Sequence, residues 1–206
     1  MSTAASAEAA AAGRRPPRIL IIPGLHDSGP AHWQTWLQGQ YRDARRVTQR
    51  DPSRPELERW AERITRTLEV AGDGEWLAVA HSFGCLALAR HLADQPGSPI
   101  REALLVAPAE PDKFGLAHAL PQHRLPRRAR LIASSTDPWM SAASAARWAH
   151  RWGASYSNLG NAGHINAEAG FGPLPAARSW VEAARARAAA EHRPRAAAFS
   201  AWACTI

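Results

Sequence analysis

The sequence predicts an α/β protein in which a mostly parallel sheet is covered by helices on both faces. Short apolar and β-branched runs alternate along the chain with longer segments in which apolar residues recur at helical spacing. Residue types that carry chemistry follow several of the predicted strands directly. This is expected of a parallel sheet, because its active residues gather beyond the carboxyl ends of the strands.

Six segments are predicted to be strands, and most are short apolar runs bounded by turn residues. The first, 18–22, is rich in isoleucine, and 76–80 is apolar throughout. The weakest candidate is 45–49, which contains two arginines. The predicted strands, in chain order, are 18–22, 45–49, 76–80, 102–106, 129–134 and 154–159.

Five segments are predicted to be helices. The clearest is 55–70, which has a proline at its start, acidic residues in its first turn and an apolar stripe at helical spacing. Between the strands 102–106 and 129–134, the segment 108–126 contains four prolines and has no clear period, so we expect a loop with room for one helical turn. The predicted helices are 31–41, 55–70, 83–93, 141–152 and 175–191.

The length of 206 residues suits one domain, which we place at 18–191. We expect the Ala-rich segment 1–17 to be a disordered extension without signal-peptide features, and the order of 192–206 is left open. No apolar run approaches the ~20 residues that cross a bilayer, so no membrane association is expected. Cys85 and Cys204 give no disulfide framework, which favours a reduced, cytoplasmic setting.

The net charge of +7 comes almost entirely from arginine, since Lys113 is the only lysine. Nucleic-acid binders more often show a basic stripe with interleaved aromatic residues or a reading helix, and neither is present. The densest group of cations is interpreted as solvated surface, and no nucleic-acid partner is expected. That group consists of Arg124, Arg127, Arg128 and Arg130.

Ser82 lies where the predicted strand 76–80 runs directly into the predicted helix 83–93. Such a junction strains the corner residue, so the positions two residues away on either side must be small. Ala80 and Gly84 meet this requirement. The pattern is that of a nucleophile elbow with alanine in place of the first glycine, and it places the hydroxyl at a helix N-terminus, where a developing oxyanion is favoured. A serine that merely caps the helix is the alternative.

Two later strands are each followed by a residue that a serine nucleophile needs. Asp137 follows the strand 129–134, and His164 follows the strand 154–159. An imidazole can take the proton of a serine hydroxyl near neutral pH, and a carboxylate on its other ring nitrogen fixes the tautomer. The chain order Ser82, Asp137, His164, with each residue after its own strand, predicts a catalytic triad.

Other residues compete for these roles. Glu110 and Asp112 also follow a strand, but Asp137 is preferred as the acid because the helix that follows fixes its direction. His26 and His81 are alternative bases. His81 precedes the serine, yet adjacent side chains at a tight turn generally diverge. His26 belongs to the loop after the first strand, where it is expected to shape the pocket. The nine histidines show no helical ligand spacing beside an acidic residue, so no metal and no other cofactor is expected.

Four segments together resemble a known family, the small serine hydrolases related to retinoblastoma-binding protein 9, and the similarity extends over about 18–180. The resemblance implies a compact α/β-hydrolase fold with the triad given above. It also implies that the backbone amides of Leu25 and Phe83 form the oxyanion hole. The four segments are 22–34, 80–84, 135–138 and 160–166.

The segment 107–128 is too short to form a separate cap with its own core, so we expect a shallow, open site without a large cap. His26, Phe114 and Trp139 are the expected pocket residues. Phe83 is a further candidate, although ordinary core packing is an equal alternative for it.

The predicted function is a serine hydrolase that cleaves small carboxylic esters, or related thioesters or amides, through an acyl-enzyme on Ser82. The expected partner is therefore a small-molecule ester or amide, and the oligomeric state is left open. The alternative is a protein-binding module with the same fold, in which hydrolysis is incidental.

Overall fold

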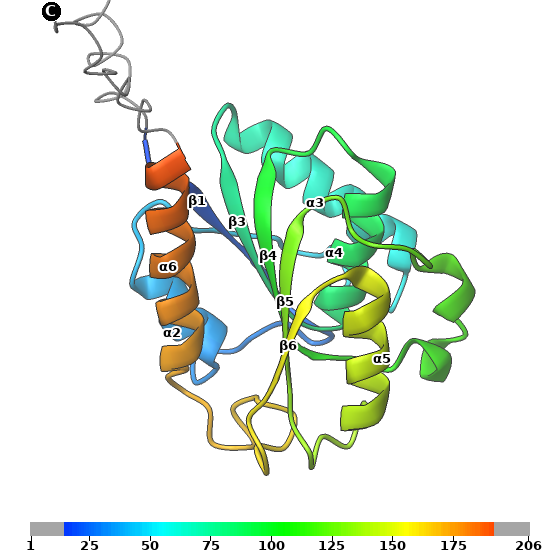
Figure 1. The fold of residues 1–206 in the computed structure, drawn as a ribbon. Coiled ribbons are helices and arrows are strands. Elements are labelled where there is room, and N and C mark those ends of the chain that lie inside the picture. The colour runs from blue at the N-terminus through cyan, green and yellow to red at the C-terminus, as the bar shows by residue number, and fades with distance from the viewer. Residues whose placement is uncertain (1–14, 192–206) are drawn as a thin grey trace, which may run out of the picture.

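The computed structural model describes residues 15–191 as a single parallel sheet with helices on both faces (Figure 1). All neighbouring strands pair in parallel, in the order β2-β1-β3-β4-β5-β6. The predicted fold class is therefore confirmed. The strands are β1 (Arg18–Ile22), β2 (Arg45–Arg46), β3 (Trp76–Ser82), β4 (Ile100–Pro108), β5 (Arg128–Ala133) and β6 (Ser155–Asn158).

The described residues contain five α-helices, four of which connect strands, while α6 follows the last strand. Helices α3, α4 and α5 lie on one side of the sheet, and α2 and α6 lie on the other (Figure 1). Every expected helix lies within two residues of the observed bounds. The helices are α2 (Trp33–Gly39), α3 (Leu57–Ala71), α4 (Phe83–Asp94), α5 (Ala142–Trp152) and α6 (Pro175–Glu191).

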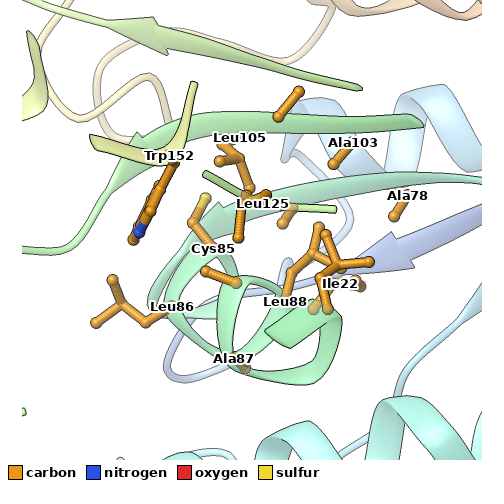
Figure 2. Packing of buried hydrophobic residues seen from close by; sticks show 14 of the residues in the cluster. Ile22, Ala78, Cys85, Leu86, Ala87, Leu88, Ala103, Leu105, Leu125 and Trp152 are labelled. Carbon is orange, nitrogen blue, oxygen red and sulfur yellow. The ribbon is translucent and has the colours of Figure 1, made fainter. Parts of the chain in front are cut away.

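The central strands β1, β3 and β4 are buried on both faces, and their side chains alternate between two apolar cores. In β1, Leu20 and Ile22 face the core under α3, α4 and α5, whereas Ile19 and Ile21 face the core under α2 and α6. Figure 2 shows part of the first core, to which Cys85 of α4, Leu105 of β4 and Leu125 all contribute. Two covered faces leave the carboxyl edge of the sheet as the place for loops with chemical function.

The segment 108–126 is more ordered than expected. It contains two short 3₁₀-helices, η1 (Pro111–Phe114) and η2 (Ala117–Ala119), instead of an irregular loop with one turn. The sequence pattern did not indicate these two helices, because the prolines of this segment interrupt any helical period. A proline is nevertheless compatible with the first position of a helix, which Pro111 occupies in η1. As expected, the segment between β4 and β5 contains only these two short helices and no cap domain.

The predicted extension and tail fall largely on residues 1–14 and 192–206, which lie outside the described residues. Within residues 15–191, no helix is long and apolar enough to cross a membrane.

Candidate active site

Ser82 stands at the junction of β3 and α4 with a φ of 52° and a ψ of −126°. A non-glycine residue rarely adopts this conformation, so the surrounding packing must hold it. Gly84 shows how tight that packing is, because a Cβ on it would lie 2.3 Å from the Pro23 carbonyl oxygen. Only glycine fits at position 84, and the turn presents the Ser82 side chain at the carboxyl edge of the sheet.

The structure brings Ser82, Asp137 and His164 together from three separate loops. The Ser82 Oγ lies 2.9 Å from the His164 Nε2, and the His164 Nδ1 lies 2.9 Å and 3.0 Å from the two carboxylate oxygens of Asp137. A carboxylate accepts hydrogen bonds, so the hydrogen of the neutral imidazole is assigned to Nδ1 and Nε2 is left free to accept the serine proton. This arrangement can remove a proton from Ser82.

The Asp137 carboxylate is held in place from a second direction. The Trp139 amide donates to its Oδ1 at 2.8 Å, and the Asp137 side chain is only 2% exposed. The competing acids lie elsewhere: Asp112 is exposed on η1, and Glu110 precedes that helix. Of these three carboxylates, only Asp137 contacts the His164 ring in the described part of the chain.

The loop after β1 passes directly over Ser82. A Cβ on Gly24 would lie 2.7 Å from the Ser82 Cβ, so the peptide that leads into Leu25 runs against the serine side chain. The Leu25 amide belongs to this loop, and the Phe83 amide is in the first turn of α4, where helix N–H groups lack intrahelical partners. Both amides therefore come from the segments that flank the Ser82 hydroxyl.

Of the three predicted pocket residues, Trp139 lies beside this arrangement. The Trp139 side chain is 46% exposed, and its ring centre is 6.1 Å from that of His164. Lys113 on η1 donates to the Pro138 carbonyl oxygen at 2.8 Å and lies over the Trp139 ring, which ties η1 to the loop that carries Asp137. Phe114, also on η1, is half-buried.

The other aromatic candidate, Phe83, is fully buried and belongs to the core. Its ring packs edge-on against Trp60 and Phe114, at centroid distances of 5.0 Å and 5.2 Å. His26 is exposed in a left-handed turn, and its amide donates to the Pro52 carbonyl oxygen. Among residues 15–191, no hydrogen bond or ring contact joins the His26 side chain to Ser82, Asp137 or His164.

Residues 19–183 match the model of a family described as "Serine hydrolase". The chain belongs to the serine hydrolase family. No curated protein matches it. The link to retinoblastoma-binding protein 9 itself remains a resemblance.

Several solved structures are similar to this chain, and those below 25% identity show a similar fold alone. A protein from Pectobacterium atrosepticum, described as a YdeN-like hydrolase, is 31% identical with a TM-score of 0.77, over 92% of this chain and 98% of that one. The ydeN gene product of B. subtilis has a TM-score of 0.69 and 22% identity, over 82% and 99% of the two chains. Est1E from Butyrivibrio proteoclasticus, solved with ferulic acid, shares only the fold, with 11% identity and a TM-score of 0.61 over 84% and 88%.

Sequence reasoning missed a buried group of rings behind the imidazole of this hydrolase. His81, set aside as a base, lies with its ring centre 4.8 Å from that of His164, and the ring of His32 lies 4.8 Å from His81 on another side. The alternation of side chains along the predicted strand could have indicated which face His81 occupies. In β3, His81 falls on the same face as Leu77 and Val79, which is the face opposite the core under α4.

Buried polar side chains also fix the loop after β1, and the sequence did not single them out. Gln34 of α2 is fully buried; its amide nitrogen donates to the carbonyl oxygens of Ile22 and Val79, and its Oε1 accepts from the Ser28 hydroxyl at 2.6 Å. Arg46 donates to Asp27 and to the Ser28 carbonyl oxygen. These bonds join the end of β1 and the middle of β3 to the loop that covers Ser82.

Backbone strain in the hydrolase is concentrated at the same edge of the sheet. All non-glycine residues with positive φ in residues 15–191 follow or end a strand at its carboxyl end. Such residues persist only where the surrounding structure holds them. They are His26, Asp27, Ser82, Ala107 and Ile165.

Within residues 15–191, no group of three or more His, Cys, Asp or Glu side chains could hold a metal ion. That the hydrolase needs neither a metal nor another cofactor stays a prediction.

Proposed function

We propose that this serine hydrolase cleaves small carboxylic esters, or related thioesters or amides, through an acyl-enzyme on Ser82. The observation that carries the proposal is the 2.9 Å approach of the Ser82 Oγ to the His164 Nε2, with the Asp137 carboxylate on the opposite ring nitrogen. A serine hydroxyl is a weak nucleophile until a base takes its proton, and this geometry supplies the base.

In the first half of the reaction, the Ser82 Oγ attacks the acyl carbon while its proton moves to the His164 Nε2. The carbonyl oxygen becomes an oxyanion, which the amides of Leu25 and Phe83 stabilise from the two segments that flank the serine. Asp137 holds the Nδ1 hydrogen and stabilises the imidazolium. When the tetrahedral intermediate collapses, the bond to the leaving group breaks and His164 returns the proton to that group.

In the second half, water attacks the acyl carbon and gives its proton to the His164 Nε2. Collapse of the second tetrahedral intermediate breaks the bond to the Ser82 Oγ, which takes the proton back, and the carboxylic acid leaves. The exposed Trp139 beside His164 supports an open site suited to small substrates.

The test is covalent labelling combined with ester hydrolysis. A fluorophosphonate probe should label wild-type protein and fail to label Ser82→Ala, and p-nitrophenyl acetate hydrolysis should fall to background in the same variant. Ser179→Ala, at an exposed serine of α6, is the matched control and should behave as wild type. Equal labelling of Ser82→Ala and wild type would refute the assignment of the nucleophile. Wild-type protein without labelling or hydrolysis would favour the binding-module alternative.

A further inference from the structure

His164 lies in a long connecting loop, so contacts from outside this loop must hold its imidazole close to Ser82. Residues 159–174 join β6 to α6 without any regular helix or strand. Ile165, which directly follows His164, has a φ of 47°, which is a strained conformation for a β-branched residue. Because strain of this kind relaxes unless neighbouring groups oppose it, the turn at His164 needs external anchors.

Two buried ring N–H groups supply such anchors, and they reach consecutive carbonyl groups of this turn. The His81 Nε2 lies 2.9 Å from the His164 carbonyl oxygen, and the Trp33 Nε1 donates to the Ile165 carbonyl oxygen at 2.8 Å. A carbonyl oxygen only accepts hydrogen bonds, so the hydrogen of His81 is on Nε2. One anchor comes from the strand that carries Ser82 and the other from the first residue of α2.

The two donor rings are themselves fixed by packing. Trp33 is fully buried and His81 is 5% exposed, and their rings meet edge-on at 5.9 Å. His32 packs against both of them, at 4.8 Å from His81 and 5.5 Å from Trp33. Burial lowers the pKa of His81 well below that of an ordinary imidazole, and the nearby rings of His164 and His32 lower it further. His81 is therefore neutral at neutral pH and keeps a single N–H for this bond.

We infer that His81 and Trp33 are positioning residues, which hold the His164 imidazole at hydrogen-bond distance from Ser82 by fixing the carbonyl groups of His164 and Ile165. The inference rests on the proposed function. It assigns to His81 a part in the reaction without making it the base, since its N–H points at the backbone of the loop and not at Ser82. The strand that presents the nucleophile thus also sets the place of the proton acceptor.

The decisive comparison is between His81→Leu, which removes the donor, and His81→Gln, whose amide nitrogen can occupy the place of Nε2. Each protein is assayed on p-nitrophenyl acetate well below its own melting temperature. In His81→Leu we expect kcat to fall roughly 10- to 100-fold with little change in KM, because misplacement of a reacting group slows chemistry more than it weakens binding. In His81→Gln we expect kcat within about threefold of wild type.

His91→Leu is the matched control, since His91 is also a buried histidine with hydrogen bonds, to Thr65 and Ser98, but lies between α3 and α4. It should lower the melting temperature and leave kcat of the folded protein unchanged. A folded His81→Leu protein with wild-type kcat would overturn the inference. So would a loss of activity in both His→Leu variants that merely follows the unfolded fraction.

If His81→Leu does not fold, Trp33→Phe decides, because it keeps a large buried ring and removes only the N–H toward Ile165. A lower kcat at unchanged KM supports the inference, and wild-type kcat in this variant refutes it. Fluorophosphonate labelling separates this failure from failure of the proposed function. Labelling that depends on Ser82, together with normal turnover in the ring variants, would leave the function standing and remove only the positioning role.

Discussion

Gly24 lies so close to Ser82 that a Cβ on the glycine would stand 2.7 Å from the Ser82 Cβ and 3.3 Å from its Oγ. Both of these serine atoms belong to the rigid turn between β3 and α4, so the first loop would have to move if position 24 carried a side chain. That loop also carries the Leu25 amide. The contact therefore links the loop after β1 to the reacting hydroxyl.

Gly24→Ala should impair catalysis by lifting the first loop away from Ser82. We expect kcat for p-nitrophenyl acetate to fall roughly 10- to 100-fold, since one of two oxyanion donors would be displaced. Gly29→Ala is the control in the same loop, because a Cβ there meets nothing within 4 Å. Unchanged kcat in a folded Gly24→Ala protein would show that the Leu25 amide does not contribute.

Asp137→Asn should leave the fold intact and lower kcat by orders of magnitude, roughly 10⁴-fold by analogy with a protease triad. The amide would favour the wrong tautomer of His164, whose Nδ1 now faces both carboxylate oxygens. Steady-state kinetics and a thermal melt measure the two effects separately. Glu110→Gln and Asp112→Asn serve as controls. Near-normal turnover in Asp137→Asn would move attention to those two carboxylates.

Short acyl chains should be the better substrates. A methylene group contributes about 0.8 kcal/mol only where it is buried, and the wall beside His164 is an exposed tryptophan. Across p-nitrophenyl esters we expect kcat/KM to be highest between acetyl and butyryl, and we expect no activation at a lipid interface. A steady rise of kcat/KM into long chains would indicate a deep lipid channel.

Acid should destabilise the protein through its buried neutral histidines. Burial lowers the pKa of His91 to about 4, against an ordinary value of 6.5. Between these values the unfolded state binds more protons than the folded state, so the free energy of unfolding falls as pH falls through this window. From about pH 7.5 to about pH 5, His91 alone should account for a loss of about 2 kcal/mol.

Urea unfolding of wild type and His91→Gln at the two pH values tests this expectation. The variant should lose less stability on acidification than wild type does, although His32, whose pKa burial also lowers to about 4, continues to contribute in both. His118→Gln, at an exposed histidine on η2, is the control and should show the wild-type loss. An identical loss in wild type and His91→Gln would contradict the assignment to His91.

The parallel sheet could be predicted because its central strands β1, β3 and β4 are apolar runs, which leave little ambiguity in an alternating chain. Strand bounds were harder to predict where charged residues are paired. β4 begins at Ile100 and not at Glu102, since Arg101 is paired with Glu75 and Glu102 with Arg187 at the strand's start. Such partners are distant in sequence, and only the folded chain shows that these charges belong to a strand.

The residues gathered around Ser82 could be predicted from their place after strands, because parallel topology brings carboxyl ends together. The supports behind them could not be predicted in the same way. His81 reaches the His164 carbonyl oxygen across 83 positions of sequence, and Trp33 reaches Ile165 across 132. No local pattern encodes a hydrogen bond to a backbone carbonyl so far away, although the strand period did place His81 on the correct face.

The positive-φ non-glycine residues all lie near the carboxyl ends of the strands, so the two ends of the sheet differ in how safely they can be mutated for thermostability. Relaxing any of them would shift the loops that meet at Ser82, so thermostability sought there competes with turnover. The loops at the amino ends of the strands lie away from Ser82, so stabilising substitutions there do not compete with turnover. Gly97, between α4 and β4, has an ordinary φ and open space around its missing Cβ, and alanine there should add about 0.4–1 kcal/mol by restricting the unfolded chain. A mutant library designed to raise thermostability can therefore be confined to the loops at the amino ends of the strands, which face away from Ser82.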